Sequence, residues 1–404
     1  MSNVLRRWIP ALRWLPGYDR RDLGGDLSAG FTVAVMLIPQ GMAYAMLAGL
    51  PPIVGLYASV FPLLAYALLG TSRQLAVGPV AMVSLLVATG VGAIAPAGSR
   101  GYVALAIALA GMVGALQLAM GVLRLGALVT FLSHPVVSGF TSAAAIIIGL
   151  SQLEHLLGVR LEKSPRLHEL VVDAAGALGD THAITLAIGA GSIAVLLLLK
   201  RWRPRFPGAI TVVVIGTLLT WALGLADRGV RIVGEVPSGL PLPSVPALDL
   251  SRLGALLPTA ITIALVGFLE SISVAKAFAR KNGYQVDANQ ELRALGAANV
   301  VGLFSGAYPV TGGFSRTAVN AQAGARTGLA SIITAVVIGV SLVLFTPLFY
   351  YLPRAVLAAI VMAAVIGLVD VREPVHLWKV KRTDAVLLGL TFVATLFLGI
   401  EEGS

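Results

Sequence analysis

Thirteen long apolar runs constrain this chain more than any other feature. A bilayer core about 30 Å thick is crossed by roughly 20 apolar residues in a helix. Runs close to this length lie at residues 25–48, 52–70, 74–95, 101–123, 127–153, 181–199, 207–226, 254–278, 288–306, 309–323, 327–350, 354–370 and 383–400. The pattern predicts an all-α polytopic membrane protein.

Composition agrees with this prediction and removes several function classes. The chain is 57% hydrophobic and 12% charged, whereas soluble domains carry about 25% charged residues. It contains no cysteine, which excludes disulfides, thiolate metal ligands and cysteine nucleophiles. The sequence also lacks the motifs of zinc peptidases, serine hydrolases and P-loop nucleotide hydrolases. We therefore expect no enzyme activity, no catalytic residue, no metal and no cofactor.

The basic residues predict how the chain is oriented in the bilayer. With the N-terminus in the cytoplasm, the span count puts nineteen lysines and arginines on the cytoplasmic side and eight on the other, as the positive-inside rule requires. These residues are scattered over short loops, so the net charge of +10 does not indicate nucleic-acid binding. Residues 1–24 interleave arginine with tryptophan and leucine, which is typical of a cytoplasmic interfacial segment.

The segment from Tyr308 to Arg316 places helix breakers and a full charge inside apolar sequence. Arginine at bilayer depth costs at least about 2.5 kcal/mol, so it must face water, protein or an anion. Gly312 and Gly313 let the backbone approach a ligand, and a helix beginning near Phe314 would present free N–H groups to an anion. The segment predicts an anion site. The competing interpretation is a kinked structural helix whose arginine pairs with a carboxylate.

A similar interruption occurs in the first half, where Gly78, Pro79 and Val80 open an apolar run much as Tyr308, Pro309 and Val310 do in the second. Paired interruptions at corresponding places point to a transporter site at a repeat interface. An odd number of spans in each repeat makes the two copies inverted. The predicted substrate-binding residues in these two segments are Gly78, Pro79, Val80, Thr311, Gly312, Gly313, Phe314, Ser315 and Arg316.

Two further spans carry polar side chains that fit such a site. Glu270 is the only carboxylate well inside a span. Burial favours its neutral form and a nearby arginine favours its charged form, so the residue is either a proton acceptor, a fixed partner of Arg316 or a structural cap. Gln40 and Tyr44 lie four residues apart beside Pro39 and therefore share a helix face. They suit orientation of a small solute, and interhelical hydrogen bonds are the alternative.

Six separated motifs make the chain resemble the sulfate permease family, also called solute carrier family 26, over nearly its whole length. The motifs are Leu12-Arg13-Trp14-Leu15-Pro16, Gly25-Asp26-Leu27-Ser28-Ala29-Gly30, Ile38-Pro39-Gln40-Gly41-Met42-Ala43-Tyr44-Ala45, Gly70-Thr71-Ser72-Arg73, Gly283-Tyr284-Gln285-Val286-Asp287-Ala288-Asn289-Gln290-Glu291 and Gly313-Phe314-Ser315-Arg316. The resemblance implies anion transport on a fold of two inverted seven-span repeats, with half-helices and short extended segments at spans three and ten.

The family's substrate site lies between those half-helices, and the resemblance implies that Gln40, Tyr44, Ser315 and Arg316 contribute to it. The proton-coupled bacterial and plant branch has a glutamate where Glu270 stands, which implies proton symport. The family pattern also implies a core domain and a gate domain. We expect an interfacial segment at residues 1–24, core spans at 25–126 and 254–353, and gate spans at 127–253 and 354–404.

The sequence departs from the family at its C-terminal end, where the family continues through a fourteenth span into a cytoplasmic STAS domain. This sequence stops at residue 404, so we expect the fourteenth span and the STAS domain to be missing from it. The resemblance further implies a bacterial inner-membrane location. The partners that we expect are a small anion, protons and the lipid bilayer, with a homodimer as a possible assembly.

The leading functional hypothesis is a secondary active transporter of small anions, working by proton-coupled symport and alternating access. Sulfate, bicarbonate, chloride and small dicarboxylates all suit one arginine and helix dipole ends, and the lack of a second intramembrane cation argues against a tightly held divalent ion. Because the chain resembles a bacterial member of the family, carboxylates including C4-dicarboxylates are expected ahead of sulfate. An anion channel or an exchanger on the same scaffold is the alternative. A scaffolding membrane protein, which would carry no flux, is the third class.

Overall fold

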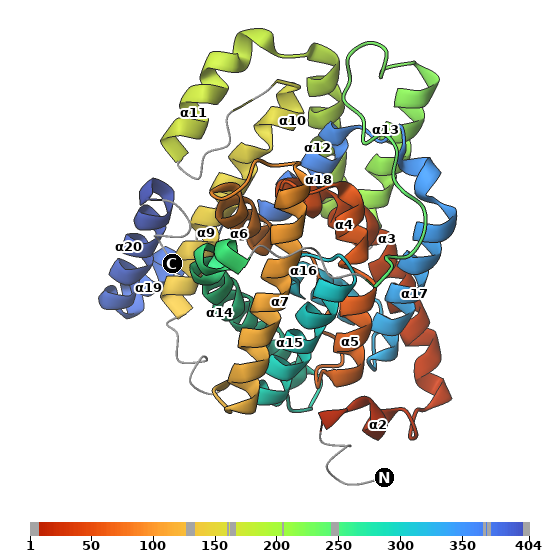
Figure 1. Ribbon diagram of the computed structural model, residues 1–404, viewed down its shortest axis with the longest axis vertical. Coiled ribbons are helices and arrows are strands. Elements are labelled where there is room, and N and C mark those ends of the chain that lie inside the picture. The colour runs from red at the N-terminus through yellow and green to blue at the C-terminus, as the bar shows by residue number, and fades with distance from the viewer. Residues whose placement is uncertain are drawn as a thin grey trace. The chain divides into compact units, whose positions relative to one another are not determined.

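The computed structural model describes residues 8–126, 134–159, 161, 167–203, 206–243, 250–366, 369 and 373–398. Each of the thirteen predicted spans contains at least one helix, which confirms the all-α prediction. Residues 127–133, 367–368, 370 and 399–400 of those spans lie outside the described part of the chain. The described elements are shown in Figure 1.

Six described helical segments are long and apolar enough to cross a membrane: Arg20–Leu47, Pro52–Leu69, Arg100–Val122, Ser138–Leu157, Ala183–Trp202 and Arg252–Lys281. Shorter apolar helices lie at Ala81–Gly92, Gly208–Ala222, Leu329–Leu344 and Arg354–Val365. The predicted span at residues 52–70 is divided into α4 (Pro52–Tyr57) and α5 (Phe61–Leu69), because the chain turns at Val60 and Pro62 opens the second helix.

The chain forms two compact units. The first consists of Met1–Ala45, Gly49–Phe131 and Ser238–Phe345, and the second of Met46–Ala48, Leu132–Pro237 and Thr346–Ser404. The elements of the first unit are α2 (Ala11–Trp14), η1 (Arg20–Asp22), α3 (Leu23–Leu47), α4, α5, β1 (Val77–Gly78), α6 (Ala81–Gly92), α7 (Arg100–Val122), α14 (Leu250–Lys281), α15 (Ala288–Phe304), β2 (Thr311–Gly312), α16 (Phe314–Gln322) and α17 (Leu329–Leu344).

Helices α7 and α15, distant in sequence, lie side by side in the first unit (Figure 1). Two glycines allow the close approach. A Cβ atom on Gly114 would lie 2.7 Å from the carbonyl oxygen of Gly296, and one on Gly296 would lie 2.7 Å from the backbone nitrogen of Leu118. Small residues at such crossings let the backbones of membrane helices pack directly. The close packing of α7 against α15 therefore explains part of the glycine content of the chain.

Two buried carboxylates hold the ends of helices in the first unit. Asp26 accepts hydrogen bonds from the backbone nitrogens of Arg326 (2.7 Å) and Thr327 (3.0 Å), from the Thr327 hydroxyl and from Tyr18. Burial and the adjacent Asp26 carboxylate raise the pKa of Tyr18 to about 12, so its hydroxyl remains a donor at neutral pH. Glu291 likewise accepts from Tyr66, Thr71 and Ser72.

The elements of the second unit are α9 (His134–Ser151), α10 (Leu153–Leu157), α11 (Leu167–Gly176), η2 (Ala177–Asp180), α12 (Ala183–Trp202), α13 (Gly208–Ala222), η3 (Thr346–Phe349), α18 (Arg354–Val365), α19 (Glu373–Val380) and α20 (Arg382–Leu398). Helix α18 contacts α9, α10, α12 and α13. Helices α9 and α20 also lie side by side (Figure 1).

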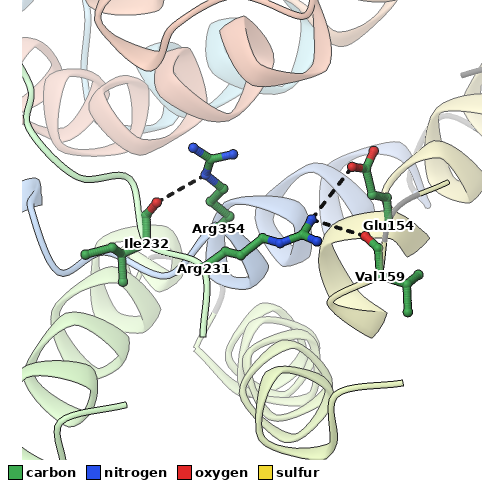
Figure 2. Close-up of polar contacts among 5 residues, drawn as sticks. All are labelled: Glu154, Val159, Arg231, Ile232 and Arg354. Atoms are coloured by element: carbon green, nitrogen blue, oxygen red, sulfur yellow. Dashed lines mark hydrogen bonds and ion pairs between the residues drawn. The ribbon is translucent and has the colours of Figure 1, made fainter. Parts of the chain in front are cut away.

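The start of α18 is fixed by a strand-like contact. The backbone nitrogen of Val233 donates to the carbonyl oxygen of Leu352 (2.9 Å), and the backbone nitrogen of Arg354 donates to the carbonyl oxygen of Arg231 (3.0 Å). Figure 2 shows the side chains: Arg231 Nη1 donates to the Val159 carbonyl oxygen (3.2 Å) and lies 3.9 Å from Glu154 Oε1, and Arg354 Nε donates to Ile232 (3.1 Å). Exposed ion pairs contribute little, so the backbone contacts carry most of this anchoring.

Candidate functional site

Two short helices begin directly after a two-stranded sheet within the first unit. We call this meeting of residues 77–80 with residues 311–316 the crossing. Strands β1 and β2 pair antiparallel, with Val77 opposite Gly312 and Gly78 opposite Thr311. Helix α6 follows Val80 and helix α16 follows Gly313. With 12 and 9 residues, they are about 18 and 14 Å long, roughly half of a bilayer core. The predicted half-helices with extended segments at spans three and ten are therefore present, and α16 begins at the predicted residue, Phe314.

The N-termini of the two half-helices lie next to each other. A Cβ atom on Gly313 would lie 3.3 Å from Cγ1 of Val80, so the residues that precede the two helices are in contact. The first N–H groups of a helix have no partner within it and carry partial positive charge. The crossing thus places two groups of N–H donors around one point, and this arrangement favours an anion.

Arg316 lies in the first turn of α16 and is 1% exposed. Its Nη1 donates a hydrogen bond to the carbonyl oxygen of Pro79, which follows β1. Its Nε and Nη2 are buried and have no hydrogen-bond partner among the described residues. Buried donors are nearly always paired in folded proteins, so these two nitrogens are available to a ligand.

Within the described part of the first unit, three buried side-chain acceptors lack hydrogen-bond partners. Among the described residues, Oε1 of Gln40 on α3, Oε2 of Glu270 on α14 and Oδ1 of Asn320 on α16 accept no hydrogen bond. The Arg316 charge interacts electrostatically with Tyr44 and Glu270, which places α3 and α14 beside the guanidinium group. No ion pair joins Arg316 to Glu270 within the described part of the chain. The structure therefore does not contain the fixed ion pair between Arg316 and Glu270 that was one of the alternatives from the sequence.

Five of the other predicted site residues lie in three different surroundings. Gly78 and Gly313 flank the guanidinium group, since Cβ atoms on them would lie 3.5 and 3.1 Å from Arg316 Nη2. Phe314 and Ser315 are exposed and form the open side of the α16 N-terminus. The Thr311 hydroxyl bonds to the Gly267 carbonyl oxygen and to Ser271 Oγ, each at 2.6 Å.

The structure brings the Gly78, Pro79 and Val80 segment together with residues 311–316, but it corrects the alignment of the two prolines. Helix α6 begins two residues after Pro79, whereas α16 begins five residues after Pro309. When the helix starts are aligned, Pro79 corresponds to Gly312. The two interruptions are equivalent and the two prolines are not, because proline is compatible with either side of a short strand.

Sequence reasoning missed the residues that hold the crossing in place. Asn299 of α15 bonds to both backbone groups of Val310, and Ser271 of α14 accepts from the backbone nitrogen of Gly312 (2.8 Å). Asn320 donates to the carbonyl oxygen of Gln74 (2.9 Å). The available signal was a polar amide within apolar sequence, as at Asn299 between Ala298 and Val300, because such residues in membrane helices usually have a specific partner.

Comparison with known proteins agrees with this geometry. Residues 23–391 match the model of the sulfate permease family. The chain is 45% identical to sulfate transporter 4.1, chloroplastic, of Arabidopsis thaliana and 39% identical to a probable sulfate transporter of Mycobacterium tuberculosis, in each case over 98% of this chain. It spans 58% of the length of the first protein and 70% of the second.

Solved structures show the same fold. The murine solute carrier 26 family member A9 anion transporter, in the inward-facing state, superposes with a TM-score of 0.94 at 28% identity, covering 100% of this chain and 70% of that one. The transmembrane domain of a cyanobacterial bicarbonate transporter gives a TM-score of 0.85 at 25% identity, covering 95% and 98% of the respective chains. The protein therefore has the inverted-repeat fold of these multi-pass membrane proteins. It belongs to the sulfate permease family.

Proposed function

We propose that this protein is a secondary active transporter that carries a small oxyanion together with protons by alternating access. The observation that carries the proposal is the pair of unpaired Arg316 nitrogens at the meeting point of two helix N-termini. A buried guanidinium group that forms no ion pair among the described residues is costly unless a nearby negative charge, such as a bound anion, compensates it. Helix dipoles and free N–H groups add to the attraction of an anion.

Glu270 supports the proton-coupled form of the proposal. When Glu270 is ionised, its charge cancels that of Arg316, and when it is protonated the site has a net charge of +1. Protonation of Glu270 therefore strengthens anion binding, and anion binding strengthens protonation by the same factor. The coupling free energy for linked sites is typically about 1 to 3 kcal/mol. Such reciprocal binding is the thermodynamic requirement for symport.

Sulfate is the first substrate to test, because two relatives at 45% and 39% identity have sulfate in their names. The name of a structural neighbour adds bicarbonate. A site with one arginine and one protonatable carboxylate suits sulfate when Glu270 is protonated. The unpaired acceptors on Gln40 and Glu270 also suit an oxyanion that carries its own O–H group. Carboxylates, including C4-dicarboxylates, remain competitors in the same assay.

Alternating access in this proposal is movement of the first unit, as the core domain, relative to the second unit, as the gate. All the proposed site residues belong to the first unit, so the substrate would travel with it. The proposal places the N-terminus in the cytoplasm and the chain in the inner membrane of a bacterium. A homodimer is a possible assembly, and the mass of the detergent-solubilised protein tests it.

Uptake of labelled sulfate into proteoliposomes tests the function. The expected result is saturable uptake that an inward proton gradient makes concentrative, with inhibition by competing unlabelled oxyanions in order of affinity. Flux that only dissipates an existing sulfate gradient would support a channel, and uptake that requires an internal anion would support an exchanger. Absence of flux for every anion in a competition panel would refute anion transport.

A further inference from the structure

We propose that Asn299 is a positioning residue that sets the place of the α16 N-terminus, and with it the affinity of the site for its anion. This inference rests on the proposed function, because it concerns the same site. Asn299 comes from α15 and is 0% exposed, and its side-chain hydrogen bonds go to Gln117, Leu295 and Val310, none of which is a predicted site residue. Its effect would be transmitted through the backbone of Val310.

The side-chain amide of Asn299 replaces a neighbouring strand. Its Oδ1 accepts from the backbone nitrogen of Val310 at 2.8 Å, and its Nδ2 donates to the Val310 carbonyl oxygen at 3.0 Å. Residue 310 immediately precedes β2, whose own residues pair with β1. The amide therefore holds both polar groups of the backbone at the point where the chain enters the crossing. A buried backbone without such a partner would cost free energy at each unpaired group.

The amide itself is held in one orientation. Its Nδ2 also donates to the Leu295 carbonyl oxygen and to Gln117 Oε1, both at 3.1 Å. Gln117, on α7, donates in turn to the carbonyl oxygen of Ala264 on α14 at 3.3 Å. Asn299 is thus tied directly to α7 and, through Gln117, to α14, and the hydrogen-bond pattern fixes which end of the amide faces the backbone nitrogen of Val310. A network in which every member is satisfied rigidifies the element it holds.

The backbone at Val310, which Asn299 holds, is close along the chain to the positive charge of Arg316. Five residues separate Val310 from Arg316, and they comprise β2, Gly313 and the start of α16. Ser271 and Thr311 secure the middle of the segment. Glycines at 312 and 313 leave this backbone intrinsically permissive, so its position depends on the side chains that hold it. Displacement of the segment would move both the helix N-terminus and the Arg316 guanidinium group.

Two substitutions test the assignment. Asn299→Ala removes all four hydrogen bonds. Asn299→Asp keeps the shape and an acceptor for the Val310 nitrogen. It also replaces Nδ2 by an oxygen, which then faces the carbonyl oxygens of Val310 and Leu295 and Oε1 of Gln117. Thr334→Val is the matched control, because it also removes a buried hydrogen-bonding group, a hydroxyl that bonds to Gly30 and Ala330. This hydroxyl is remote from the site, since Gly30 lies about 15 Å along α3 from Gln40.

The first measurement is anion affinity by direct binding, corrected for the folded fraction from thermal unfolding. We expect the dissociation constant to rise about tenfold or more in both Asn299 variants, since small misplacements of binding groups are costly, and to stay at the wild-type value in Thr334→Val. A purely structural role predicts lower thermal stability with unchanged affinity in the folded protein, and that result would overturn the assignment. If wild type itself binds no anion, the proposed function fails instead.

The second measurement does not depend on a ligand. The chain has no cysteine, so spin labels can be attached at Ala93→Cys, just after α6, and Gln322→Cys, the last residue of α16. Both positions are exposed. The distance distribution between the labels should shift or broaden with Asn299→Ala and Asn299→Asp and should match the parent with Thr334→Val. Identical distributions in all four proteins would show that Asn299 does not position α16.

Discussion

Arg316 donates a hydrogen bond from Nη1 to the carbonyl oxygen of Pro79, so the side chain from the second half of the sequence is held by the backbone from the first. This contact uses one of the three guanidinium nitrogens. The Nε and Nη2 atoms remain without partners among the described residues. The bond therefore fixes the charge at the crossing and leaves the donors that an incoming anion requires.

Removal of this charge should weaken anion binding. Arg316→Ala eliminates a buried, charged donor while the N-termini of α6 and α16 remain. Losing a hydrogen bond to a charged group costs about 1.5 to 3 kcal/mol, which is roughly ten- to a hundred-fold in affinity. The measurement is the dissociation constant of the transported anion, with Arg228→Ala, an exposed arginine, as control. An unchanged constant in folded Arg316→Ala protein would exclude the residue from the site.

Asp26 provides a stability prediction that is independent of transport. Asp26→Ala leaves the part-buried backbone donors of Arg326 and Thr327 without their acceptor. We expect the free energy of unfolding to fall by at least about 1.5 to 3 kcal/mol. Tyr18→Phe removes only the longest of these hydrogen bonds, at 3.2 Å, and should have a smaller effect. Equal melting temperatures for Asp26→Ala and wild type would contradict this role.

The movement of the first unit can be followed by distance measurements in the cysteine-free background. Labels at Ala93 and Gln322, both in the first unit, should keep their separation during turnover because the proposed movement carries the crossing as one body. Labels at Gln322 and Ala222, which belong to different units, should change separation when substrate and a proton gradient are supplied. Pulsed electron spin resonance provides both distances. A fixed distance between Gln322 and Ala222 in actively transporting protein would refute alternating access by this route.

The sequence predicted the helical membrane fold and the break before Phe314 because both depend on local properties. Apolar length, proline, paired glycines and an arginine within a span are visible without any tertiary contact. The burial of Arg316 and the antiparallel pairing of residues 77–78 with 311–312 required the structure. These features arise from contacts between segments more than two hundred residues apart, and a single sequence does not specify such contacts.

Polar residues in the spans were harder to interpret than charged ones. Thr311 was predicted to bind substrate, yet its hydroxyl is occupied by Gly267 and Ser271. Asn299 and Ser271 were not singled out, although they hold the backbone of the crossing. An amide or hydroxyl group in a membrane helix has the same sequence signature whether it faces a ligand or a backbone. Only its hydrogen-bond partners distinguish the two roles.

The central claim is that Glu270 carries the proton that drives anion accumulation. Glu270→Gln preserves the size of the side chain and much of its hydrogen-bonding capacity but removes its titration. A permanently neutral residue leaves the site with the net charge of the protonated form, so anion binding should survive and should no longer depend on pH. Thermal unfolding in detergent checks that the variant is folded.

The most direct test is sulfate accumulation by Glu270→Gln in proteoliposomes, measured with and without an inward proton gradient beside the wild type. The account predicts that the wild type concentrates sulfate when the gradient is applied, whereas the folded variant only equilibrates it across the membrane. A folded variant that still concentrates sulfate in response to the gradient would contradict the account.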